Sequence, residues 1–309
     1  MKSSSLTNDN KEIRRNKLMR AIFIIAMIIV PILNFLVFYL YVNFNSILMA
    51  FQKTDVFGNT TYTLEWFELT LKGLFVTGEM LLYLRNTMYY FCTSLFVIMP
   101  LTALIAYFIY KKIFMYKFFR VIFFLPSIFS AVVLVTVYKQ ILGIEGPIAT
   151  FFAQKNNLAS IPDFFNDPAY ATPAIISYCI WTGFGTNLIL MTGAMARIPE
   201  DVLEAAQLDG ISWGRELISI ILPMIWPTFT TLIVMTFVGI FTSSGPILLF
   251  TRGEWDTGTI SYFIFQQVYF GGGNQEYAAA VGIFFTIIAV PIILLVKKLM
   301  ERWQDAVEY

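Results

Sequence analysis

The 309-residue sequence contains no histidine, only two cysteines and few charged side chains. The absence of histidine removes the most common general base near neutral pH and the commonest nitrogen ligand of metals. Cys92 and Cys179 both fall within long apolar stretches. There we expect small buried side chains rather than a disulfide framework. These absences argue against a metal site and against a histidine-dependent enzyme.

Charged side chains are also scarce in this sequence. Charged residues make up 13% of the chain and hydrophobic residues 58%, whereas a soluble domain carries roughly 25% charged residues. The net charge is +1, and no basic cluster is interleaved with aromatic residues, so no nucleic-acid partner is predicted. A chain with so little polar surface is expected to lie in a lipid bilayer, as a multi-pass protein of the cell membrane.

Six stretches are long and apolar enough to cross a membrane, which takes about 20 residues of helix. We therefore predict an all-α integral membrane fold with six transmembrane helices, the third being the weakest because its uncharged run, Val121–Tyr138, is at the lower limit of length. The first stretch follows a basic tail but is longer than the 7–15 residues typical of a signal peptide, so it is interpreted as a retained helix. The predicted spans are 21–42, 87–110, 119–141, 171–195, 221–244 and 277–297.

The lysines and arginines are distributed unevenly between the two sides that these spans define. The tails and the segments 111–120 and 196–220, with their span ends, hold 15 of the 21, and the opposite side holds six. Because cytoplasmic segments are enriched in Lys and Arg, both termini and the 196–220 segment are predicted to be cytoplasmic. The loops 43–85, 142–170 and 245–276 are then extracytoplasmic.

These boundaries divide the chain into three parts. Residues 1–85 form a cytoplasmic tail, the first span and an outer loop. Residues 86–300 form the membrane core, which includes the polar segment 199–223, and residues 301–309 form a short cytoplasmic tail. No internal repeat at a fixed period is visible, which disfavours a carrier built from inverted repeats.

The polar segment between the fourth and fifth spans has the signals of two short helices joined by a turn. Pro199 suits the first turn of a helix, and acidic residues follow it, where they favour the helix dipole. Asp209-Gly210 predicts a turn, because glycine can take the left-handed conformation that ends a helix. Ser212 is then a candidate cap for the next helix. The alternative interpretation is an ordinary connecting loop.

Two alanines and several charged or aromatic side chains mark this segment as a surface for a soluble partner. Ala205 and Ala206 share one side of the first helix with Val202 and Asp209 and form a low surface that another protein can approach closely. Trp213 and Arg215 follow the turn. The segment therefore predicts a hairpin that a partner binds.

The same residues resemble the EAA loop of the permease subunits of binding-protein-dependent ABC importers. That motif consists of Glu-Ala-Ala, three residues, Gly, nine residues and an apolar-x-Leu-Pro ending. The matching residues here are Glu204, Ala205, Ala206, Gly210, Ile220, Leu222 and Pro223. Asp209-Gly210 is similar to the carbohydrate-uptake branch, whereas Ile211 and Leu217 depart from that branch's Ala and Phe. Weaker similarities at 85–87, 119–133, 181–199 and 273–280 extend the resemblance to about residues 85–297.

The resemblance implies a type-1 ABC importer transmembrane domain with several partners. These are a second permease subunit, two ATPase subunits and an extracytoplasmic solute-binding protein. The second permease is an identical or a related chain, and we favour a related one. The resemblance further implies that Glu204 pairs with a basic group on the ATPase, that Ala205 and Ala206 pack in its cleft, and that Gly210 provides the bend. We add Asp209, Trp213 and Arg215 as expected contacts.

The chain lacks the residues that ATP hydrolysis needs. A phosphate-binding loop requires G-x-x-x-x-G-K-[ST], and the dipeptide Gly-Lys does not occur. We therefore predict no enzyme activity and no cofactor in this chain, with ATP and magnesium bound by the ATPase subunits.

Charged residues are also missing from the depths of the predicted spans, which favours a neutral polar solute over a coupling ion. Because sugars commonly contact aromatic faces and hydroxyl-pairing groups, we predict a carbohydrate path. Ser, Thr and Gly also mediate helix packing in membranes, so packing is their alternative role. The candidate lining residues are Tyr178, Trp181, Gly183, Thr186, Asn187, Thr236, Gly239, Phe241, Thr242 and Ser243.

The sequence thus predicts a permease subunit that forms half of the path for a sugar or oligosaccharide. One alternative is the same machinery importing a polyol or a peptide-like compound. A secondary carrier would need coupling-ion groups in the membrane, and an intramembrane enzyme would need a catalytic cluster at depth. The sequence contains neither.

Overall fold

The computed structural model describes residues 3–55, 57–155, 163–241 and 245–305. The chain forms two compact units, Met1–Leu64 and Glu65–Tyr309. The division falls before the predicted boundary at residue 85, and α3, Glu65–Lys72, packs within the second unit against the last helix.

The first unit is a long helix followed by a small two-stranded β-hairpin. The helix comprises α1 (Ser3–Asn34), a π-helical segment η1 (Phe35–Tyr41) and α2 (Val42–Met49). Strands β1 (Gln52–Thr54) and β2 (Thr60–Tyr62) then pair antiparallel, with Lys53 opposite Thr61. Asn16–Met49 is long and apolar enough to span a membrane, in agreement with the predicted first span.

The second unit is helical throughout its regular elements. It begins with α3 and the short η2 (Gly73–Thr77), and α4 (Glu79–Thr93), η3 (Ser94–Ile98) and α5 (Met99–Tyr110) then form one continuous helix. The next elements are α6 (Tyr116–Phe124), η4 (Leu125–Ser127), α7 (Ala131–Leu142), α8 (Pro147–Lys155), α9 (Pro168–Thr182) and α10 (Gly185–Met195). The chain continues with α11 (Glu200–Leu208), α12 (Trp213–Glu216), η5 (Leu217–Ile221), α13 (Leu222–Met224), α14 (Trp226–Val238) and η6 (Gly239–Phe241). It ends with α15 (Ile247–Phe250), α16 (Ile260–Tyr269) and α17 (Gln275–Asp305).

Among the described residues, five helices are long and apolar enough to span a membrane, or six when one bent pair counts as a span. The second, fourth and sixth predicted spans correspond to Glu79–Tyr110, Pro168–Met195 and Gln275–Trp303. Each of these helices extends beyond the predicted bounds. The predicted all-α membrane fold is confirmed.

The prediction of one continuous third span at 119–141 is wrong. Helix α6 ends at Phe124, a 3₁₀ turn contains Pro126, and the backbone is extended at Ser130 before α7 begins. Proline has no N–H for the helix ladder and its ring crowds the preceding turn, so it interrupts the helix here. The apolar candidate span instead runs from Ala131 to Lys155.

The fifth span is also not straight. Trp213–Met224 and Trp226–Phe241 meet at a bend of 82°. Ile225 has φ −97° and ψ 9°, outside the helical range, and Pro223 and Pro227 stand on either side of it. The two missing N–H groups weaken the helix at this point, which explains the bend.

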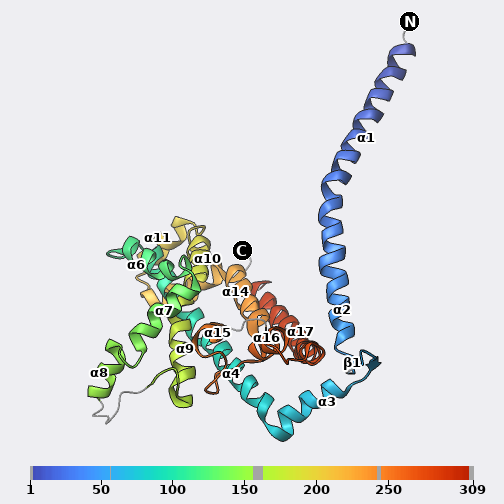
Figure 1. Ribbon diagram of the computed structural model, residues 1–309. Helices are drawn as coiled ribbons and strands as arrows, with labels where there is room; N and C mark the ends of the chain where they lie inside the picture. The colour runs from blue at the N-terminus through green and yellow to red at the C-terminus, as the bar shows by residue number, and fades with distance from the viewer. Residues whose placement is uncertain (1–2, 56, 156–162, 242–244, 306–309) are drawn as a thin grey trace. The chain divides into compact units, whose positions relative to one another are not determined.

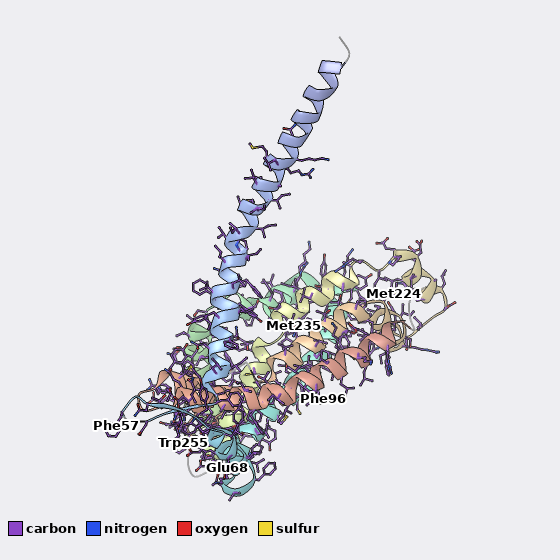
Figure 2. All side chains as sticks on the ribbon, turned by 90° about the vertical axis from the view of Figure 1, so that its right-hand side faces the viewer. Phe57, Glu68, Phe96, Met224, Met235 and Trp255 are labelled. Atoms are coloured by element: carbon purple, nitrogen blue, oxygen red, sulfur yellow. The ribbon has the colours of Figure 1, made fainter. Side chains whose placement is uncertain are left out.

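Helix packing in the second unit joins segments far apart in the chain. Helix α5 packs against α10, and α17 packs against both α14 and α16; α14 and α17 are drawn side by side (Figure 1). Large apolar side chains remain on the outside, including Phe96, which is 69% exposed, and Met235, which is 64% exposed (Figure 2). Such exposure suits a surface solvated by lipid.

Candidate functional sites: a polar hairpin and a central cavity

The predicted hairpin is present, and its turn is a Schellman motif. The Gly210 amide donates to the Gln207 carbonyl (3.1 Å), and the Ile211 amide donates to the Ala206 carbonyl (3.3 Å). Gly210 has φ +69°, the left-handed conformation that this motif requires and that favours glycine. The sequence therefore predicted both the turn and the residue that makes it.

Details at the two helix starts differ from the prediction. Pro199 precedes the first turn of α11 instead of lying within it, with ψ 136°. Ser212 occupies the position before α12, but its side chain makes no capping hydrogen bond. The Ser212 carbonyl accepts from the Glu216 amide (2.8 Å), so the main chain starts this helix without a side-chain cap.

The first helix of the hairpin has a buried side and an exposed side. Leu203 and Ala206 are 9% and 5% exposed and pack against their own chain. The expectation that both alanines lie on the open surface is wrong for Ala206, because the side of α11 that carries it faces the protein core. Ala205 is exposed, as predicted.

The exposed side presents an apolar residue that sequence reasoning missed. Leu208 is 89% exposed and lies four residues after Glu204, so both project from the same side of α11. The signal was a leucine on an otherwise polar helix side. The exposed residues of the hairpin that were predicted as contacts are Glu204, Ala205, Asp209, Trp213 and Arg215.

Trp213 links the hairpin to the end of the second span. Its ring lies 5.7 Å from that of Phe108 on α5, while 59% of the residue remains exposed. One part of the Trp213 side chain therefore packs against the helix bundle, and the rest is exposed.

A buried ion pair makes a second link between the same two elements. Lys111 Nζ lies 2.8 Å from Glu216 Oε1, and the side chains are 25% and 5% exposed. Tyr107 Oη donates to the other carboxylate oxygen, Oε2, at 3.3 Å. The buried Glu216 carboxylate therefore has partners for both oxygens, as a charge removed from solvent requires.

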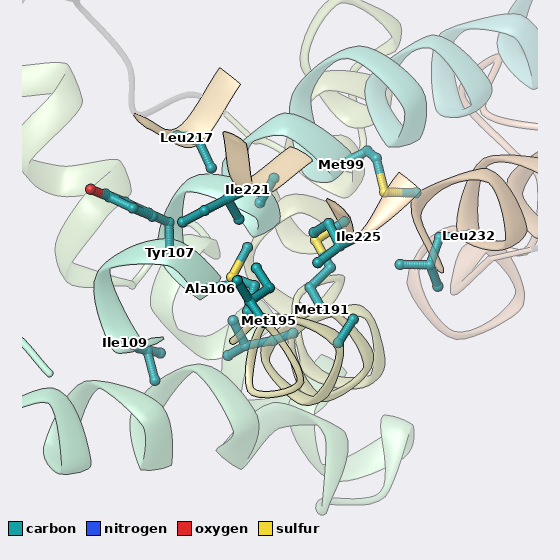
Figure 3. Packing of buried hydrophobic residues seen from close by; sticks show 14 of the residues in the cluster. Met99, Ala106, Tyr107, Ile109, Met191, Met195, Leu217, Ile221, Ile225 and Leu232 are labelled. Carbon is teal, nitrogen blue, oxygen red and sulfur yellow. The ribbon is translucent and has the colours of Figure 1, made fainter. Parts of the chain in front are cut away.

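The outgoing arm of the hairpin continues directly into the largest apolar core. Leu217, Ile221 and Ile225 are buried and pack in one cluster with Met191 and Met195 of α10 (Figure 3). A displacement of the hairpin is therefore transmitted to the helices that pack around this core, because close-packed interiors transmit strain.

A cavity of about 240 Å³ lies between the second, fourth and fifth spans. Threonine, serine, tyrosine and apolar side chains surround it, and none of the described residues that line it is charged. Tyr90 lines it, and the Tyr90 hydroxyl is buried with no hydrogen-bond partner among the described residues. The lining residues are Thr87, Tyr90, Phe91, Thr93, Ser94, Ile98, Cys179, Thr236, Gly239, Ile240, Gly245 and Thr259.

Two of the predicted path residues, Thr236 and Gly239, line this cavity. Gly183 instead allows close packing, because a Cβ there would lie 2.8 Å from Ile98 Cδ1. Phe241 packs against Phe285 at 4.9 Å between ring centroids. The sequence pattern alone could not separate lining residues from packing residues, because both roles use the same side-chain types.

Four other predicted path residues, which the structure describes, are absent from the cavity lining. Tyr178 is 4% exposed within an aromatic cluster. Trp181 stacks on Tyr138 at 6.1 Å and is 40% exposed. Thr186 is exposed and Asn187 is half-buried on α10. Thr242 and Ser243 lie outside the described residues, so their assignment stays a prediction.

A loop that borders the cavity is held in place by two residues of the second span. The Asn86 amide donates to the carbonyls of Asp256 (2.6 Å) and Gly258 (2.8 Å). Thr87 Oγ1 accepts from the Ile260 amide (3.1 Å). Thr259, between these anchors, lines the cavity. The sequence pattern at 85–87 carries only a resemblance and gives no sign of this role.

Within the described segments, no group of three or more His, Cys, Asp or Glu side chains is placed to hold a metal ion. The apolar spans and the exposed apolar surface define a multi-pass membrane protein. The chain belongs to the family of binding-protein-dependent transport system inner membrane components, whose family model matches residues 94–307.

Relatives of known name or structure agree with this membership. The arabinooligosaccharides transport system permease protein AraP of Bacillus subtilis (strain 168) is 24% identical over 278 residues, covering 87% of this chain and 85% of that protein. A crystal structure of a bacterial ABC transporter that imports the acidic polysaccharide alginate matches 94% of this chain and 98% of its own, with TM-score 0.76 and 25% identity. The alginate transporter in complex with a pentasaccharide-bound periplasmic protein matches with TM-score 0.78 and 24% identity, over 95% and 97% of the two chains.

Proposed function

We propose that this chain is one of two permease subunits of an ATP-driven importer for a neutral oligosaccharide. The observation that carries the proposal is the hairpin, in which a Schellman turn at Gly210 presents Glu204 and Leu208 on one exposed side. A structured and partly apolar surface between two spans is suited to a soluble partner.

The partner on this surface is an ATPase subunit. The excess of Lys and Arg on the side of the hairpin supports a cytoplasmic position for it and for both termini. Glu204 then pairs with a basic group of the ATPase, while Ala205, Leu208 and Trp213 supply apolar contact. The absence of a Gly-Lys dipeptide supports the assignment of ATP and magnesium to the ATPase subunits.

The second permease subunit completes the solute path. The cavity of about 240 Å³ is smaller than the roughly 300–1,000 Å³ of a typical small-molecule site. One chain therefore provides part of a chamber that a related chain completes. An extracytoplasmic binding protein delivers the solute, in keeping with the family's description and with the periplasmic protein of the alginate complex.

The choice of a neutral oligosaccharide follows from the lining of the cavity. Hydroxyl-bearing side chains such as Tyr90, Thr93 and Thr236 pair with sugar hydroxyls, and Phe91 offers an aromatic face. An acidic sugar would require a cation among these residues, and the lining has none. The name of AraP supports an oligosaccharide as the class of cargo.

The proposal is tested by uptake in cells that express the complete system. Glu204→Lys is expected to leave the protein in the membrane and to abolish ATP-dependent oligosaccharide uptake, and Gly210→Trp is expected to do the same. Glu145→Lys, at an exposed position after α7, is the matched control and retains uptake. Full uptake by both hairpin variants would contradict the proposal, and uptake that needs no ATPase but collapses with a protonophore would identify a secondary carrier.

A further inference from the structure

The hairpin and the cavity are joined by a single continuous helix. Glu79–Tyr110 carries Thr87, Tyr90 and Ser94 at the cavity and ends beside the hairpin. At 1.5 Å per residue, the distance from Ser94 to Lys111 along this helix is roughly 25 Å. A shift at the hairpin reaches the cavity through this helix only if its end is attached to the hairpin.

Besides the apolar core that α5 shares with the hairpin, the attachment includes an ion pair, a hydrogen bond and an aromatic contact. Lys111 follows the last residue of α5 and pairs with Glu216 of the hairpin (2.8 Å), and Tyr107, one turn earlier, donates to the same carboxylate. Trp213 lies against Phe108. Because Glu216 is 4% exposed, solvent does not compete strongly for its carboxylate, and the pair is geometrically defined.

Neither Lys111 nor Glu216 belongs to the exposed surface that meets the partner. Glu216 projects inward from the same short helix that carries the exposed Trp213 and Arg215. A carboxylate at this position therefore serves the connection between the hairpin and the second span instead of the contact with the ATPase.

We propose that the Lys111–Glu216 pair is a positioning contact that makes the hairpin and the cytoplasmic end of the second span move as one unit. This inference rests on the proposed function, because it assigns the pair to the transmission of ATP-driven movement. Breaking the pair uncouples the hairpin from the helix that lines the cavity, while the surface that binds the ATPase remains complete.

The test follows the cavity directly and needs no knowledge of the sugar. Ser94→Cys, in a background with Cys92→Ser and Cys179→Ala, places a reporter thiol on the cavity wall. Its labelling by a membrane-impermeant methanethiosulfonate is measured in the purified complex in nanodiscs, with and without ATP. With the ion pair intact, ATP is expected to change the labelling rate at least tenfold.

Each single charge reversal, Lys111→Glu or Glu216→Lys, is expected to reduce the ATP-dependent change in labelling rate to less than twofold. The milder variants Lys111→Met and Glu216→Gln are expected to reduce this change partially. The double variant Lys111→Glu/Glu216→Lys restores the opposite charges and is expected to recover at least half of the response. Lys112→Glu makes the same charge change at the exposed neighbouring position and is expected to retain the full response. Membrane abundance and co-purification of the ATPase are measured for every variant.

Two results would overturn the inference. One is a full ATP response in all single variants. The other is a lower membrane abundance of the single variants with an unaltered ATP-dependent labelling change per molecule. A pair that only stabilises the fold would give this second result. If the protein with the intact pair showed no ATP response at all, the proposed function would fail, so the two failures are distinguishable.

Discussion

The side-chain amide of Asn86 donates a hydrogen bond to the main-chain carbonyl of Gly258, 172 residues further along the chain, at 2.8 Å. The same amide also donates to the Asp256 carbonyl. Gly258 in turn lies against the Tyr83 ring, where a Cβ would not fit. Asn86 of the second span therefore holds the loop that borders the cavity.

Asn86→Ala is expected to destabilise the protein by about 1–3 kcal/mol, because it leaves two carbonyl groups without their donor. The measurement is the midpoint of thermal unfolding in detergent. Asn59→Ala, at an exposed position, is the control and is expected to leave the midpoint unchanged. Equal midpoints for both variants would show that the amide does not hold the loop.

Replacement of Gly210 tests the Schellman turn. Gly210→Ala is expected to cost roughly 1–2 kcal/mol, because an L side chain is disfavoured at φ +69°, and Gly210→Val is expected to cost more. Gly214→Ala is the control, since a Cβ there meets no atom within 4 Å and its φ is not positive. Unfolding midpoints of the three variants decide the matter, and an equal effect at Gly210 and Gly214 would refute the turn.

Leu208 is expected to be an apolar anchor for the ATPase. Leu208→Asp should weaken co-purification of the ATPase about tenfold or more, because a buried interface anchor contributes at least 1–2 kcal/mol. The folding midpoint should not change, since the residue is 89% exposed in this chain. Gln207→Asp, an exposed neighbour, introduces the same charge and is expected to have a smaller effect. Undiminished binding by Leu208→Asp would remove Leu208 from the interface.

Tyr90→Phe removes one hydroxyl from the cavity wall and changes little else. Loss of a hydrogen bond to a sugar is expected to raise the half-saturating concentration for transport in proteoliposomes roughly two- to tenfold. Tyr89→Phe is the matched control, because Tyr89 is adjacent, 50% exposed and absent from the lining. Identical saturation curves for both variants and the wild type would mean that the Tyr90 hydroxyl does not contact the cargo.

The features that could be predicted from the sequence are those that depend on short stretches of neighbouring residues. Long apolar runs predict spans because the bilayer sets their length, and Asp209-Gly210 predicts the turn because only certain residues adopt its backbone conformation. The bend of 82° at Ile225 was missed, because prolines are tolerated in straight membrane helices as well as in bent ones.

Contacts between distant residues were beyond sequence reasoning. Ala205 and Ala206 are identical in type, and only packing against the rest of the protein determines that one is exposed and the other buried. Glu216 was assigned no role, because its partner Lys111 lies on another span. In the cavity, Thr236 and Thr186 are equivalent as sequence, yet only Thr236 lines it.

The most direct test of the central claim measures solute uptake and ATP hydrolysis together in proteoliposomes that contain this chain, its second permease, the ATPase and the binding protein. We predict that the wild-type complex accumulates a radiolabelled neutral oligosaccharide in proportion to the ATP consumed. In the Glu204→Lys complex, accumulation should fall at least tenfold while the permease remains in the membrane. Accumulation by the Glu204→Lys complex at the wild-type ratio of sugar to ATP would contradict the account.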